Sequence, residues 1–202
     1  MFRRRCLRVF ACMAALPGLV FPAFGRDVSF DYYVLALSWS PAYCATPESS
    51  SSKHQCEGRK VYGFIVHGLW PQKERGGLVT NCRPMSSISR NDVERLFSVM
   101  PDERLIRYQW KKHGSCAEMR PEDYAGAIVR AFSSLDLSGF DPSRFLQADE
   151  ARQRLLRDNR QLSGESVRLI CRRGVFREVR ICLTRTDLMP RPCPSSLREN
   201  CF

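Results

Sequence analysis

Several signatures of common enzyme classes do not occur in this chain of 202 residues. It has no glycine-rich loop of the Walker type and no Gly-x-Ser-x-Gly elbow, which argues against a P-loop NTPase and an α/β-hydrolase. It also has no His-Glu-x-x-His motif and no paired Cys-x-x-Cys motifs, which argues against the zinc sites built on them. Histidine is scarce, with three residues, so any imidazole chemistry is confined to very few positions.

Internal repeats and low-complexity domains are also missing from the sequence. The chain is 44% hydrophobic and 26% charged, which is ordinary for a globular protein and excludes a disordered tail, a collagen-like fibre and a multi-pass membrane protein. Its length favours a single domain. The net charge of +11 favours an anionic partner, such as a nucleic acid, a membrane surface or an acidic polysaccharide.

The first 25 residues have the pattern of a secretory signal peptide. Arg3, Arg4, Arg5 and Arg8 precede an apolar run over 9–21, and small residues follow up to Gly25. The apolar run is shorter than the roughly 20 residues that span a bilayer, which disfavours the alternative of an uncleaved anchor. We therefore expect cleavage near Gly25, a mature domain over 26–202 of net charge 28 − 21 = +7, and a periplasmic or secreted protein without stable membrane association.

Eight cysteines remain in the predicted mature chain, and an even number in an exported protein indicates four disulfides. Composition alone leaves all 105 pairings of eight cysteines open. The eight are Cys44, Cys56, Cys82, Cys116, Cys171, Cys182, Cys193 and Cys201.

The hydrophobic pattern predicts a mixed α+β domain. Strands are predicted over 29–39, 60–66, 166–171 and 175–183, and amphipathic helices over 93–100, over 121–132 with Pro121 in the first turn, and within 149–162. The polar stretch 45–54 is interpreted as a loop closed by nearby cysteines. Arg177, Glu178 and Arg180 suggest a partly solvated face on the last strand.

Two of the three histidines stand in unusual surroundings. His67 lies in FIVHGLWPQ, where we expect it at the end of a buried strand, and His113 lies in RYQWKKHGSC beside two lysines. Each alone could be a hydrogen-bonded structural residue, but the pair favours a two-histidine acid–base site. A metal site is the competing interpretation, because His113 and Cys116 have His-x-x-Cys spacing. His54, in the polar stretch, is interpreted as a surface residue.

Two histidines and a fixed cation in a basic, exported protein fit the cleavage of RNA by its own 2′-hydroxyl. One histidine removes the 2′-OH proton, the other protonates the departing 5′-oxygen, and the cation stabilises the charge at phosphorus. This chemistry needs neither a metal nor a cofactor, and the requirement for a 2′-OH excludes DNA as a substrate.

At these residues the sequence resembles the ribonuclease T2 family. HGLWPQ at 67–72 and WKKHGSC at 110–116 are similar to its two active-site segments, SWSPAYC at 38–44 to its first strand, and EVRICL at 178–183 to its C-terminal strand. The resemblance implies a single α+β domain with a mostly antiparallel central sheet, packed helices and reinforcing disulfides. The implied pairs are Cys82–Cys116, Cys171–Cys201 and Cys182–Cys193, which leaves Cys44–Cys56.

The resemblance also implies the roles of individual residues. His67 is then the general acid, His113 the general base, and Lys112 stabilises the anionic transition state. Trp70 is expected to stack a base, or else to be plain core. Together with Trp70, we expect Tyr108 and Trp110 to contact the substrate. The implied products are 2′,3′-cyclic phosphates that are hydrolysed to 3′-phosphates by a monomeric endoribonuclease.

Two positions depart from the family pattern. The family usually has Glu where this chain has Gln109, and many members have a phosphate-binding His where it has Tyr108. Gln keeps the shape of Glu but not its charge, so it no longer favours a protonated histidine nearby. We expect activity to survive with a lower rate or a shifted pH optimum. The alternatives are a non-catalytic RNA-binding or scavenging protein on the same fold, or a cationic surface-binding protein.

Overall fold

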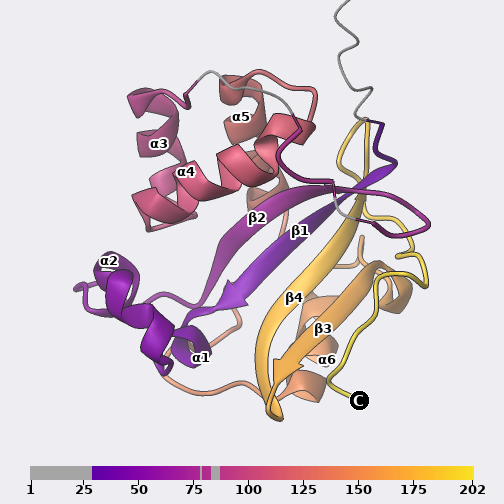
Figure 1. The fold of residues 1–202 in the computed structure, drawn as a ribbon. Helices are drawn as coiled ribbons and strands as arrows, with labels where there is room; N and C mark the ends of the chain where they lie inside the picture. The colour runs from indigo at the N-terminus through magenta and orange to yellow at the C-terminus, as the bar shows by residue number, and fades with distance from the viewer. Residues whose placement is uncertain (1–28, 78, 83–86) are drawn as a thin grey trace, which may run out of the picture.

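A four-stranded antiparallel sheet forms the centre of the computed structural model, which describes residues 29–77, 79–82 and 87–202 (Figure 1). The strand order is β2-β1-β4-β3. The bounds are β1 Tyr32–Trp39, β2 Phe64–Gln72, β3 Val167–Arg172 and β4 Val175–Thr184. The fold is therefore the single α+β domain with an antiparallel sheet that the sequence predicts. The predicted signal peptide, 1–25, lies outside the described residues.

The helices pack around this sheet (Figure 1). α4 and α5 pack against β2, α3 packs against both of these helices, and α6 packs against β3. Two short helices, α1 and α2, follow β1. The bounds are α1 Ser40–Cys44, α2 Lys53–Cys56, α3 Arg90–Phe97, α4 Glu103–Lys112, α5 Pro121–Ser133 and α6 Ala148–Asp158. No helix among the described residues has the length and apolar character needed to cross a membrane.

The main hydrophobic core lies between one face of the sheet and the helices. On β1, alternate side chains from Tyr33 to Trp39 point into it and are almost fully buried. Helix α5 contributes Tyr124 and Ile128 from its apolar stripe, and it begins at Pro121 as predicted. The opposite face of β1 is covered near its start, where Tyr32 packs with the C-terminal segment.

Two predicted elements differ from those observed. The second strand does not end before His67, since β2 continues through it to Gln72. Pro71 is tolerated because β2 is an edge strand, where a missing amide donor costs little. Helix α4 is not among the predicted helices, and the polar stretch 45–54 contains a 3-10 turn, Pro47–Ser51, and the start of α2 rather than only loop.

β-Bulges interrupt the alternation of side chains on β2, an edge strand, and on β4, an inner strand. On β2, His67 is the extra residue, because Ala36 pairs with Gly68 while Leu37 pairs with Val66. On β4 the extra residue is Arg177. A bulge re-aims the side chains around it. The two bulges allow His67 and Arg177 to reach the face of the sheet opposite the main core, where Glu178 already lies through its regular pairing with Ser38 of β1.

Four disulfides close the loops around the sheet: Cys44–Cys56, Cys82–Cys116, Cys171–Cys201 and Cys182–Cys193. This is the pairing that the family resemblance implies. Each closes between 11 and 34 residues of chain, which restricts the unfolded ensemble.

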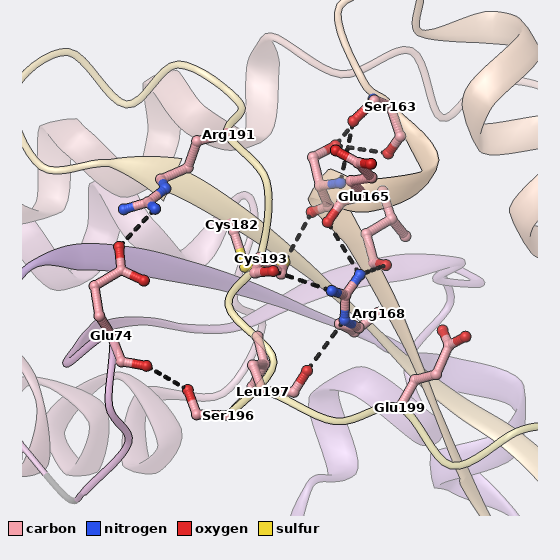
Figure 2. Close-up of a disulfide and its surroundings, with 12 residues drawn as sticks. Glu74, Ser163, Glu165, Arg168, Cys182, Arg191, Cys193, Ser196, Leu197 and Glu199 are labelled. Carbon is pink, nitrogen blue, oxygen red and sulfur yellow. Dashed lines mark hydrogen bonds and ion pairs between the residues drawn. A yellow bond between two sulfur atoms is a disulfide. The ribbon is translucent and has the colours of Figure 1, made fainter.

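The Cys182–Cys193 disulfide attaches the C-terminal segment to β4 (Figure 2). Arg168 on β3 reinforces it by donating hydrogen bonds to the carbonyl oxygens of Cys193 and Leu197, both at 3.1 Å. The covalent link and these hydrogen bonds hold Leu197 at the wall of the cleft that contains His67.

Candidate active site

A cleft of about 340 Å³ lies between β2, the end of α4 and the C-terminal segment. Six of the seven side chains that the sequence analysis assigns to catalysis or substrate binding line it, together with Arg180 of β4. The six are His67, Trp70, Tyr108, Gln109, Lys112 and His113. The remaining residue of the seven, Trp110, does not line it.

Helix α4 positions four of these side chains. Asp102 caps its N-terminus by accepting hydrogen bonds from the backbone amides of Arg104 and Leu105. Residues three and four positions apart share a helix face, so Gln109 lies near Lys112 and near His113, which follows the last turn. The Asp102 cap and the basic last turn are sequence signals that could have predicted this helix.

His113 is buried, with 7% of its surface exposed. Burial lowers its pKa from 6.5 to about 4, and the charges of Lys112 and His67 act in the same direction, while a hydrogen bond to the Val79 backbone opposes them. Its Nδ1 has no hydrogen-bond partner among the described residues. His113 is therefore a neutral imidazole at neutral pH, which is the form that can accept a proton.

His67 contacts a buried carboxylate. Its Nδ1 lies 2.6 Å from Oε2 of Glu178, and the other oxygen of Glu178 accepts a hydrogen bond of 2.7 Å from Arg180 Nε. Burial opposes ionisation of Glu178, but its hydrogen bonds and ion pairs with His67 and Arg180 outweigh this, so its pKa is lowered. The arrangement fixes the orientation of the His67 ring and leaves Nε2 for a substrate.

Glu178 is the residue of this site that the sequence analysis missed. It was predicted to lie on a partly solvated face, but it is 7% exposed. Its charged neighbours, Arg177 and Arg180, suggested a solvated face, whereas the regular pairing of β4 with β1 places Glu178 on the face that carries His67. A glutamate that begins the segment EVRICL was the available signal, but local sequence does not show that His67 lies opposite it.

Trp70 connects the two histidines. Its ring centroid lies 5.2 Å from that of His67 and 5.3 Å from that of His113, and its Nε1 donates a 2.8 Å hydrogen bond to Oε1 of Gln109. Gly68 makes this contact possible, because a Cβ there would lie within 2.4 Å of the atoms that form it. Trp70 is half-buried and lines the cleft, so it is not plain core.

Lys112 lies on the open side of the cleft. Its Nζ donates a 2.9 Å hydrogen bond to the hydroxyl of Tyr108, which is 52% exposed. The pair offers an ammonium group and a phenolic hydroxyl to an anion in the cleft. Tyr108 thus supplies a hydrogen-bonding group at the position where many family members have a histidine.

Trp110 belongs to the core rather than to the cleft. It is 5% exposed and packs against Tyr124 of α5. A Cβ on Gly114 would lie 2.1 Å from the Trp110 ring, so this glycine permits the close packing beneath His113. We therefore do not include Trp110 among the proposed substrate contacts.

The His113-x-x-Cys116 spacing does not form a metal site in this structure. Cys116 forms a disulfide with Cys82, so its sulfur is not a thiolate ligand. No group of three or more potential metal ligands occurs in the part of the chain that the structure describes.

The third histidine, His54, does not line the cleft, and its ring packs against Phe97 with centroids 4.7 Å apart.

The chain is similar to known ribonucleases in sequence and in fold. The model of the Ribonuclease T2 family matches residues 30–193. A probable ribonuclease of Haemophilus influenzae is 31% identical over 150 residues, 68% of this chain and 54% of that protein, so the chain spans about half of that relative's length. A ribonuclease of Aeromonas hydrophila is 30% identical over 187 residues, 88% of this chain and 82% of that protein.

The fold comparison agrees with the sequence comparison. The crystal structure of RNase NT in complex with 5′-AMP superposes with a TM-score of 0.62 at 21% identity, over 86% of this chain and all of that one. The family model covers most of the chain, including both histidine segments. This chain belongs to the Ribonuclease T2 family.

Proposed function

We propose that the protein is an exported, metal-independent endoribonuclease that cleaves single-stranded RNA through 2′,3′-cyclic phosphates to 3′-phosphate ends. The observation that carries the proposal is the contrast between its two histidines in one cleft. Burial and Lys112 keep His113 neutral, whereas His67 lies against the ionised carboxylate of Glu178. Opposed environments for two titratable groups are typical of a base and an acid that act together.

In the first step, neutral His113 accepts the proton of the 2′-hydroxyl as O2′ attacks phosphorus. His67, protonated and ion-paired with Glu178, donates a proton from Nε2 to the 5′-oxygen as its bond to phosphorus breaks. The ammonium of Lys112 stabilises the negative charge that grows on the phosphoryl oxygens. The products are a 2′,3′-cyclic phosphate and a free 5′-hydroxyl.

In the second step, the two histidines exchange roles. His67, now neutral, accepts a proton from water as the water attacks the cyclic phosphate, and His113 protonates O2′ as that bond breaks. A 3′-phosphate remains, and both histidines return to their starting protonation states. The nucleophile of the first step belongs to the substrate, so DNA is not cleaved.

The cleft also supports a preference for single-stranded RNA. The part-exposed ring of Trp70 can stack an unpaired base, and aromatic stacking tolerates different bases. A related fold is known in complex with 5′-AMP, a nucleotide. The predicted signal peptide and the four disulfides support export to the periplasm or the medium, where we expect the protein to act as a monomer.

The test is the release of acid-soluble nucleotides from RNA in the presence of EDTA. We expect His67→Ala and His113→Ala to lower kcat/KM by at least about 10²-fold each, because each removes proton transfer to or from the reacting oxygens. The third histidine provides a matched control, since His54→Ala leaves the cleft intact and is expected to keep wild-type activity. Turnover that needs a divalent metal, or that survives both cleft substitutions, would overturn the proposal.

A second candidate is an RNA-binding or scavenging protein that has lost catalysis at Gln109. The observation that favours it is that Gln109 is 2% exposed and contributes a neutral amide where the family usually has a carboxylate. Wild-type protein that binds RNA in EDTA without degrading it at any pH, together with a Gln109→Glu variant that degrades it, would support this candidate.

A further inference from the structure

A second cavity adjoins His67 on the side away from His113. Its volume is about 300 Å³, and it lies over the ends of β3 and β4. Three arginines line it, Arg172, Arg177 and Arg180, together with two glutamates, Glu48 and Glu178. His67 lines both this cavity and the active-site cleft, whereas Lys112 and His113 line only the cleft.

The bulge on β4 places a guanidinium in this cavity. In a regular strand, Arg177 and Glu178 would point to opposite faces of the sheet. Because Arg177 is the extra residue opposite the Ile170–Cys171 step, both side chains reach the face that carries His67. Glu178 lies on this face through its regular pairing with Ser38 of β1, so the bulge adds a cation beside the carboxylate that contacts His67.

The guanidinium of Arg177 has hydrogen-bond donors without acceptors. Its Nε and one of its terminal nitrogens are buried and have no hydrogen-bond partner among the described residues. The nearby carboxylate of Glu48 forms its ion pair with Arg172, at 3.6 Å, and Glu178 is already shared by His67 and Arg180. Buried donors without acceptors are rare in proteins, and an anion in the cavity would satisfy these.

We propose that this cavity binds the RNA phosphate that follows the scissile one on the 3′ side. The position rests on the proposed function, in which His67 protonates the leaving 5′-oxygen, so the leaving nucleotide lies on the His67 side of the cleft. The 3′-phosphate of that nucleotide is then the next anion along the chain. Arg177 contacts it with the unpaired face of its guanidinium, and Arg172 contributes a second positive charge as Glu48 is displaced.

The test uses 2′-deoxy dinucleotides, which lack the nucleophile and bind without being cleaved. Calorimetry compares d(UpAp), which carries the outer phosphate at its 3′ end, with d(pUpA), which has the same charge but carries the phosphate at its 5′ end. We expect wild-type protein to bind d(UpAp) about 10-fold more tightly, as for one charge-assisted contact. Arg177→Gln is expected to abolish this preference, and Arg172→Gln, at an exposed position where folding is unaffected, to reduce it.

Arg173→Gln is the matched control, because it removes the same charge from the adjacent turn but lies outside the cavity. It is expected to keep the full preference for d(UpAp). Equal binding of the two ligands by wild-type protein, or a preference that persists in both Arg177→Gln and Arg172→Gln, would overturn the proposal.

Cleavage of the ribonucleotide UpA by the wild-type protein separates this proposal from the proposed function. A preference for d(UpAp) without cleavage of UpA would support the phosphate site and contradict the enzyme. Cleavage of UpA without any preference between the deoxy ligands would support the enzyme and contradict the phosphate site.

Discussion

Replacement of Gln109 by glutamate is the sharpest test of how this cleft sets the protonation state of its base. Gln109 is buried, lines the cleft one helical turn before His113, and accepts a hydrogen bond from Trp70. The substitution changes charge but hardly changes shape, so Trp70 Nε1 can donate to the carboxylate as it does to the amide.

The expected change in the pKa of His113 follows from the helix geometry. Side chains four residues apart lie about 6 Å from each other, and at an effective dielectric constant of about 20 a carboxylate there stabilises protonated His113 by about 3 kcal/mol. In the wild-type protein, burial and Lys112 lower the pKa of His113 to about 4. The acid limb of the pH–activity profile should therefore lie near pH 4 in the wild type and about 2 pH units higher in Gln109→Glu.

The assay is the dependence of kcat/KM for UpA on pH, since its limbs report groups of the free enzyme. We expect the wild type to retain nearly full kcat/KM at pH 5, where Gln109→Glu falls about 10-fold below its own value at pH 7. Gln153→Glu, an exposed position on α6, makes the same change of charge away from the cleft and should leave the limb in place.

Two results would refute this reasoning. A wild-type acid limb near pH 6.5 would mean that burial does not keep His113 neutral, or that His113 is not the base. A limb that does not move in a folded Gln109→Glu variant would mean that position 109 does not act electrostatically on His113.

Two further predictions concern stability. Burial lowers the pKa of His113 from 6.5 to about 4, so between these pH values the unfolded chain binds a proton that the folded protein does not. The free energy of unfolding should therefore be highest above pH 6.5 and fall by up to about 3 kcal/mol as the pH drops to about 4. Urea unfolding at several pH values measures this fall, which should be missing in His113→Asn. The double variant Cys182→Ser/Cys193→Ser should lose about 3 kcal/mol of stability in urea unfolding, as for a loop of this length. Its KM should rise, because Leu197 is no longer held at the cleft wall; an unchanged KM would contradict that role.

The fold could be predicted largely from the sequence, because most of its elements carry a local signal. Apolar runs in the sequence indicate β1, β3 and β4, and an apolar stripe of helical spacing indicates α5. The observed bounds of these elements lie within a few residues of the predicted ones. Helix α4 was missed because its mean composition is polar and its buried residues are few. The predicted second strand ended too early, because glycine and proline, here Gly68 and Pro71, usually mark the end of a strand. The observed strand β2 lies at the edge of the sheet, where proline is tolerated.

The candidate site could be predicted only as a set of motifs. His67, Trp70, Gln109, Lys112 and His113 stand in two short segments that the sequence displays, and the structure brings those segments into one cleft. Their environments could not be predicted in the same way. Whether a histidine is buried and neutral or paired with a carboxylate depends on which distant residues cover it.

The sequence by itself determined the residue types that can do chemistry here, the number of disulfides and the family pattern. Tertiary structure alone decided that Glu178 faces His67, that Trp110 lies in the core, and that Arg177 points into a cavity beside the cleft. The physical reason is that the β1–β4 register places Glu178 on the face of His67, and that the two bulges, at His67 and Arg177, are properties of strand pairing. Each is set by the register between segments far apart in the chain, and one extra residue in a strand redirects the side chains on either side of it.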